Sequence, residues 1–254
     1  MAMDAVQAVI LIGIGLFGGV WNAIAGGASL FTFPALMAVG LPPVVANATN
    51  YLALLPSNAA ALPAYREELH GLGKTLLPLL VVSGIGAIIG SILLLVSDPD
   101  FFVVLVPFLI LVATCLFAFG DALRAWLLNT MGESRGNKAI YAGLFLSSIY
   151  GGYFGAGLGF ILLAIAQLMG FSNFHIANSI KNLLATSFTI LSVLVFGIGG
   201  LIAWPHAIAM MVGSTIGGYA GGRLAKRVNT RRLRGVVIAF GVVLSIVYFA
   251  RAFG

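Results

Sequence analysis

Long apolar runs interrupted by glycine and proline constrain this chain more than any other feature of its sequence. Several runs approach or exceed the roughly 18 to 20 residues that a helix needs to cross a bilayer. Hydrophobic residues make up 61% of the chain and charged residues only 8%, against about 25% charged in soluble domains. The runs cover residues 4–25, 28–40, 44–64, 74–97, 101–121, 138–154, 157–170, 175–198, 203–222 and 233–252. The sequence therefore predicts an all-α, polytopic membrane protein.

Glycine breaks divide two of these runs into unequal arms. The stretch AIAGGASLFTFP, residues 23–34, places a Gly pair and a Pro where the chain would otherwise be membrane helix. As helices, residues 28–40 and 157–170 would span only about 20 Å, short of the roughly 30 Å hydrocarbon core. Non-helical backbone at membrane depth is tolerated only where protein or a water-filled cavity covers it. We therefore expect the first two segments of each half to form a glycine-broken, partly re-entrant hairpin.

The second half of the chain repeats the order of motifs of the first. The shared order predicts an internal duplication with about five helical segments in each half. We expect a first repeat at 1–121, a cytoplasmic linker at 122–137 and a second repeat at 138–254. The matching pairs, offset by 128 to 131 residues, are GLF at 15–17 and 143–145, the Gly breaks at 26–27 and 155–157, Gly40 and Gly170, and Ala46-Asn47 and Ala177-Asn178.

Basic residues gather in three loops, at 65–74, 121–138 and 223–234, and the last holds six of the thirteen. The positive-inside rule places such loops in the cytoplasm. All three fall on one face only if each broken run enters and leaves the membrane on the same side. The halves are then inverted relative to each other, and both termini lie outside. We expect a multi-pass protein of the inner (plasma) membrane, whose partner is the lipid bilayer and not nucleic acid.

One lysine stands apart from the other charged residues. All seven acidic residues fall at segment ends or in loops, whereas Lys181 lies inside an apolar segment. Proton and sodium sites usually need an intramembrane carboxylate, so this distribution argues against cation transport. A buried ammonium costs several kcal/mol unless it is paired, and no acidic residue is placed to pair with Lys181. Its expected partner is a bound anion; a lysine that snorkels to the membrane interface is the alternative.

Amides, hydroxyls and helix starts surround the glycine breaks. Amide and hydroxyl groups can donate hydrogen bonds to an oxyanion, and short helices starting at the breaks would present free N–H groups. Interhelical hydrogen bonding and close helix packing are the alternative roles. The predicted substrate-binding residues are Lys181, Asn47, Asn50, Asn178, Asn182 and Ser29, together with the backbone at Gly26, Gly27, Gly155 and Gly157. No nucleophile–base pair or metal-ligand spacing is evident, so we expect no enzyme, cofactor or metal.

The residues GLFGGVWNAIAGGASLFTFPALMAVGLPPVVANATN and their echo, GLFLSSIYGGYFGAGLGFILLAIAQLMGFSNFHIANSIKN, resemble the sulfite exporter TauE/SafE family. The resemblance covers nearly the whole chain. It implies transport of sulfite, organosulfonates and related small sulfur or carboxylate anions across the inner membrane. One departure concerns the second copy, which has Leu163 where the first has Pro34. The choice of a sulfur oxyanion rests on the resemblance alone.

These expectations combine into one hypothesis about function. The chain is predicted to be a secondary transporter of small anions that works by alternating access at the interface of the two repeats. The alternative is an anion channel that uses the same path without coupled gates. A homodimer is the expected oligomer.

Overall fold

The computed structural model describes residues 3–24, 27–59, 69–70, 72–131, 137–171, 173–224 and 230–253. Parts of all three basic loops lie outside the described residues, and so does Gly26 among the predicted site residues.

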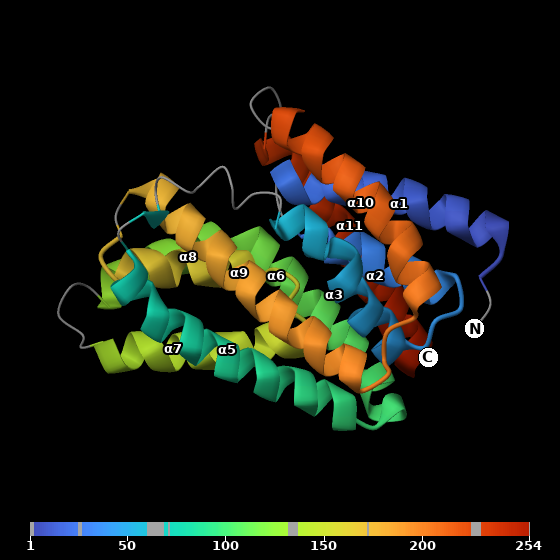
Figure 1. Ribbon diagram of the computed structural model, residues 1–254, viewed down its shortest axis with the longest axis horizontal. Helices are drawn as coiled ribbons and strands as arrows, with labels where there is room; N and C mark the ends of the chain where they lie inside the picture. The colour runs from blue at the N-terminus through green and yellow to red at the C-terminus, as the bar shows by residue number, and fades with distance from the viewer. Residues whose placement is uncertain are drawn as a thin grey trace.

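Helices make up almost all of the described chain, and no strand occurs in the described ranges (Figure 1). The helices are α1 (Ala5–Ile24), α2 (Ser29–Ala38), α3 (Pro43–Ala59), α5 (Gly73–Val96), α6 (Pro99–Met131), α7 (Asn137–Tyr153), α8 (Leu158–Leu168), α9 (Phe174–Ile198), α10 (Trp204–Leu224) and α11 (Thr230–Phe253). Of these, α1, α5, α6, α9 and α11 are long and apolar enough to cross a membrane. The prediction of an all-α polytopic membrane protein is confirmed.

Two short helices follow the glycine breaks. Helix α2 has ten residues and α8 has eleven, so each spans only about 15 to 17 Å. Gly27 precedes α2 with a φ of 78°, and Gly157 caps α8 with a φ of 79°. Glycine adopts this left-handed conformation without the steric penalty that a side chain would bring. Both short helices end just before another left-handed glycine, Gly40 and Gly170, with φ values of 95° and 93°.

Helices α1 and α10 pack closely and run parallel, as Figure 1 shows. A Cβ on Gly15 would clash with the carbonyl oxygen of Met210, and one on Gly19 would clash with that of Ser214. Both numbers rise by four between the two contacts, so the helices point in the same direction. Small residues allow such close backbone approach in membrane bundles.

Helices α5 and α7 form a second close and parallel pair. A Cβ on Gly86 would lie 2.7 Å from the carbonyl oxygen of Phe145, and one on Gly90 would clash with that of Ile149. Here too both numbers rise by four from one contact to the next. The two glycine-lined pairs flank the rest of the bundle (Figure 1).

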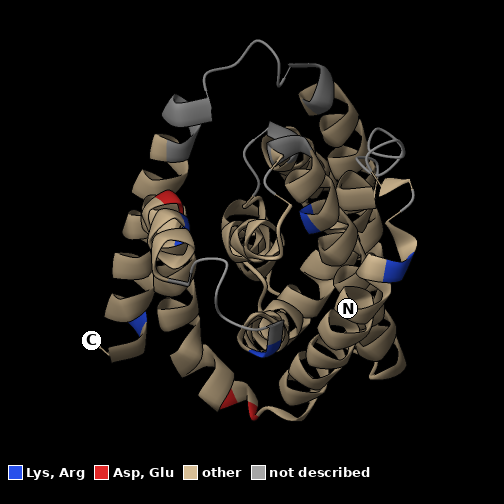
Figure 2. Cartoon of the chain, turned by 90° about the vertical axis from the view of Figure 1, so that its left-hand side faces the viewer, with Lys and Arg blue, Asp and Glu red and all other residues tan. Residues whose placement is uncertain are grey.

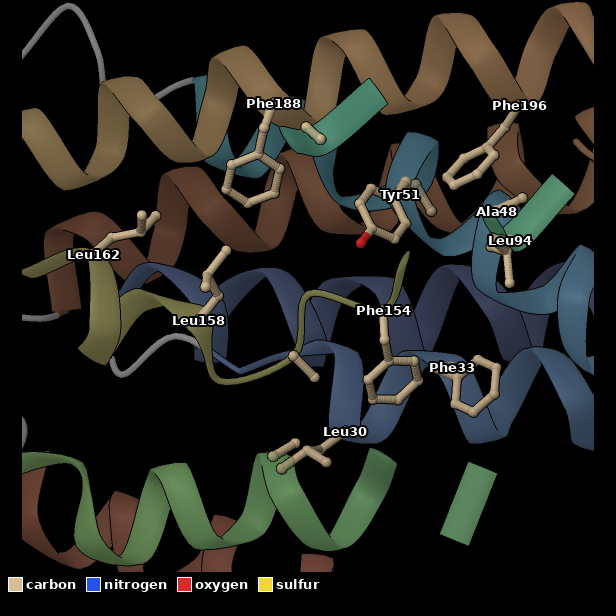
Figure 3. Packing of buried hydrophobic residues seen from close by; sticks show 14 of the residues in the cluster. Leu30, Phe33, Ala48, Tyr51, Leu94, Phe154, Leu158, Leu162, Phe188 and Phe196 are labelled. Atoms are coloured by element: carbon tan, nitrogen blue, oxygen red, sulfur yellow. The ribbon is translucent and has the colours of Figure 1, made fainter. Parts of the chain in front are cut away.

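Helices α3 and α9 contact each other between these pairs. Helix α3 also packs on α10 and α2, and α9 also packs on α5 and α8. Buried aromatic rings join these elements: the Tyr51 and Phe196 centroids are 5.4 Å apart, and those of Phe33 and Phe154 are 5.5 Å apart (Figure 3). The apolar core therefore surrounds the segment that joins α7 to α8.

Helix α6 is longer than the sequence predicted. Residues 121–131, expected in a cytoplasmic loop, continue the helix to Met131. Its 33 residues span about 50 Å, well beyond the roughly 30 Å apolar core of a bilayer. Asp121 and Arg124 therefore lie in the last third of a helix and not in a loop. Good helix formers such as Leu, Ala and Arg extend the helix after its apolar run ends.

Candidate functional site

One turn of α6 touches both glycine breaks. The ring of Phe117 lies so close to Gly27 that a Cβ there would clash with it. A Cβ on Gly157 would lie 3.1 Å from Leu116 Cβ and 3.2 Å from Ala113 O. The two breaks therefore lie at the same level along α6.

At the first break, polar side chains bond to one another. The Asn50 amide donates a hydrogen bond to Ser29 Oγ at 3.1 Å, and its carbonyl oxygen accepts one from Thr32 Oγ1 at 2.6 Å. Asn50 is only 2% exposed. These bonds fasten α2 to α3, as the interhelical alternative describes.

Side chains of α3 also reach the second break. The Asn47 amide donates to the Tyr153 carbonyl oxygen at 2.8 Å, and the Tyr51 hydroxyl donates to the carbonyl oxygen of Gly151. Because α7 ends at Tyr153, carbonyls in its last turn lack partners within the helix. Asn47 and Tyr51 satisfy two of them. Asn47 thus lies where the sequence predicted a site, with its amide already hydrogen-bonded to protein.

At the second break, Lys181 of α9 lies against the first turn of α8. A Cβ built on Gly159 would lie 3.7 Å from Lys181 Cδ and, beyond its own helix turn, would meet no other atom of the described residues within 4 Å. Among the described residues, Lys181 has no carboxylate neighbour and donates no hydrogen bond. Its neighbours Asn178 and Asn182 are partly buried on the same helix. The structure therefore brings together Lys181 and the helix start that follows Gly155 and Gly157.

The backbone amides at this helix start are weakly bonded. The Leu158 and Phe160 N–H groups each reach a carbonyl oxygen, of Gly155 and Gly157, only at 3.4 Å. In the first turn of α2, the Leu30 N–H reaches Gly27 O at 3.1 Å. Typical N–H···O bonds measure 2.7 to 3.2 Å. The amides at the start of α8 therefore make long hydrogen bonds, and the helix dipole favours negative charge there.

Polar atoms without partners continue along α9. Within the described part of the chain, Thr186 Oγ1 and Ser192 Oγ are buried and have no hydrogen-bond partner. Asn182, Thr186 and Thr189 are spaced four and three residues apart, so they share one face of the helix. A polar face on a central helix is a candidate lining for a path across the bilayer.

Charged residues are few along the described helices (Figure 2). Because charged residues are scarce in the apolar runs, the sequence alone identified Lys181 as a candidate. Two other features became evident only in the structure. Gly159 escaped notice because glycines are frequent in this chain, and only the fold shows that it faces a lysine. The contact between Arg124 Nε and Gln167 Oε1, which ties α6 to the end of α8, had no local sequence signal.

Comparisons with known proteins give one family model and several similar membrane transporter proteins. The family model described as "Sulfite exporter TauE/SafE" matches residues 11–248. A "Probable membrane transporter protein" of Haemophilus influenzae is 32% identical over 243 residues, 93% of this chain and 92% of that protein. "Probable membrane transporter protein YfcA" of Escherichia coli is 29% identical over 245 residues, 93% of this chain and 87% of its own. No solved structure matches the chain significantly.

Proposed function

The chain belongs to the sulfite exporter TauE/SafE family, and we propose that it is a secondary transporter of small sulfur-containing or carboxylate anions. Family membership makes it a multi-pass membrane transporter and not an enzyme. Sulfite and organosulfonates are the proposed substrates.

The observation that carries the proposal is the neighbourhood of Lys181 and Gly159 at the start of α8. A lysine inside the bundle has no described carboxylate beside it, and the adjacent helix start keeps weakly bonded amides. Broken helices in transporters bind anionic groups at such half-helix N-termini. An anion bound here would accept hydrogen bonds from both the Lys181 ammonium and the backbone amides. These bonds would offset the cost of burying the charged groups.

The two halves, 1–121 and 138–254, are proposed to be inverted repeats. Their relative movement would expose this site to one side of the membrane at a time. The pattern of helix contacts supports this. The first helix of each half packs on the fourth of the other, α1 on α10 and α7 on α5. The third helices, α3 and α9, contact each other, and so do the last, α6 and α11. Rocking one hairpin against the other would open the site to one side at a time.

The proposed setting is the inner membrane, with the three basic loops in the cytoplasm, both termini outside and a homodimer as the assembly. The membrane potential, negative inside, would then favour export by about 2.3 kcal/mol per negative charge per 100 mV. Among the described residues no carboxylate lies beside Lys181, so facilitated diffusion or exchange is the simplest energetic scheme.

Anion uptake into proteoliposomes tests the proposal, with a panel of sulfite, organosulfonates and carboxylates. Lys181→Met keeps most of the length of the side chain but removes its charge, and uptake should fall roughly tenfold to a hundredfold, as expected for loss of a charged hydrogen bond. Lys181→Arg should retain part of the activity. Lys138→Met, an exposed position at the start of α7, is the matched control.

Two outcomes would count against the proposal. Wild-type uptake in Lys181→Met would remove the site, and no uptake of any anion by the wild-type protein would remove the function. A channel is the second candidate. Counterflow, in which a trapped unlabelled anion drives accumulation of labelled anion, occurs in a transporter and not in an open channel.

A further inference from the structure

Gly159 is a glycine that neither the backbone conformation nor the packing of the described residues explains. It is the second residue of α8, where a glycine costs about 1 kcal/mol relative to alanine. Its φ is not left-handed, in contrast to those of Gly155 and Gly157. Among the described atoms beyond its own helix turn, a Cβ there would meet only Lys181 Cδ, at an ordinary contact distance of 3.7 Å. Neither backbone conformation nor packing against the described part of the chain therefore requires glycine at this position.

Close packing does explain nearby glycines. A Cβ on Gly151 would lie 2.6 Å from Leu158 Cδ2, and one on Gly152 would clash with the carbonyl oxygen of Ala87. Gly159 differs from both because Lys181 Cδ, at 3.7 Å, is the one described atom beyond its own helix turn that an added Cβ would contact.

The first half of the chain fills the corresponding space. At the offset of 130 to 131 residues between the halves, Ser29 corresponds to Gly159 and Asn50 to Lys181. Ser29 and Asn50 hydrogen-bond each other at 3.1 Å. The second half replaces this bonded pair with a bare backbone and a lysine that donates to no described residue. The first half is thus closed by its own side chains, whereas in the second half a Cβ on Gly159 would meet Lys181 Cδ and no further described atom beyond its own helix turn.

We propose that Gly159 is a substrate-contacting, specificity-determining residue, whose missing side chain leaves room for the head group of the anion beside Lys181. This inference rests on the proposed function and deepens it. The head group would lie over the Gly159 backbone, within reach of the amides of the first turn. A tetrahedral sulfonate, with three oxygens, needs more room there than a planar carboxylate with two.

The experiment compares two anions of the same length, isethionate and 3-hydroxypropionate, which differ in the head group. Gly159→Ala should lower uptake of isethionate by roughly tenfold or more, the effect of one methyl group in a tight pocket. Uptake of 3-hydroxypropionate should fall much less. Gly143→Ala, at an exposed helical position in α7 where the added methyl meets no described atom beyond its own helix turn within 4 Å, is the matched control and should change neither.

Thermal unfolding in detergent separates binding from folding. Both alanine variants should unfold at or slightly above the wild-type temperature, because alanine favours helix. A lower unfolding temperature for Gly159→Ala alone would overturn the inference, since the glycine would then serve packing. Wild-type uptake of both anions by Gly159→Ala, or an equal loss of both, would also overturn it. If Lys181→Met transports like the wild type, the proposed site itself fails, whatever Gly159→Ala does.

Discussion

Asn50 and Lys181 occupy matching positions in the two halves but have different surroundings. Asn50 bonds to both Ser29 and Thr32, whereas Lys181 lies over Gly159 and donates to no described residue. An amide can satisfy its donors and acceptors with hydroxyls inside the bundle. An ammonium without an acceptor needs a ligand or water to offset its desolvation.

The hydrogen bonds of Asn50 should hold the first short helix in place. Asn50→Ala removes the donor to Ser29 and the acceptor for Thr32, and we expect it to lower the free energy of unfolding by roughly 1 to 2 kcal/mol. The midpoint of thermal unfolding in detergent measures this. Asn129→Ala, at an exposed position near the end of α6, should have no effect. Equal midpoints for the two variants would contradict a fastening role for Asn50.

At the scale of elements, helix pairs joined by glycine make up the sides of the bundle. Helices α1 and α10 approach until the backbone of one meets the carbonyls of the other. Lipid tails are as apolar as leucine, so association in a bilayer depends on such close packing more than on hydrophobic burial.

Two glycines of α1 test this packing within one helix. Gly19 is buried against Ser214, whereas Gly13 is exposed and an added Cβ there would meet no atom of the described neighbouring elements within 4 Å. Gly19→Ala should destabilise the protein by roughly 1 to 3 kcal/mol through overpacking. Gly13→Ala should leave stability unchanged or raise it by up to about 1 kcal/mol. Unfolding midpoints of both variants check this, and a stable Gly19→Ala would mean that α1 and α10 do not approach as described.

For the whole molecule, we expect the short helices α2 and α8 to point in opposite directions across the proposed membrane. Parallel packing of α1 on α10 and of α5 on α7 supports this arrangement. The turn after α2, at 39–42, should then face outside, and the turn after α8, at 169–173, should face the cytoplasm.

Cysteine labelling tests this orientation. In a Cys115→Ser background, which removes the single native cysteine, Pro42→Cys should react with an impermeant maleimide in right-side-out vesicles. Asn173→Cys should react only in inside-out vesicles. Both positions are exposed. Labelling of both from the same side would rule out the inverted arrangement while leaving the anion site untouched.

The sequence by itself determines the fold class, the positions of the short helices and the candidate lysine. Apolar runs determine that the chain is a bundle of membrane helices, because burying their backbone in lipid requires helical hydrogen bonding. The glycine breaks locate the short arms, because left-handed backbone at Gly27 and Gly157 favours glycine. Charge patterning singles out Lys181, which lies well inside an apolar run of the sequence, since burying an unpartnered charge is costly.

Tertiary structure alone decided which polar groups are hydrogen-bonded within the protein. Gly159 and Lys181 are 22 residues apart in sequence, and they meet only because α8 docks back on α9. Likewise, the sequence predicted Asn50 to be a ligand-binding amide, whereas in the structure it hydrogen-bonds to Ser29 and Thr32. Local periodicity sets the face on which a side chain lies, but the angle at which helices pack sets what that face meets. The difference between the two breaks therefore arises from packing and could not be read from the pattern of residues.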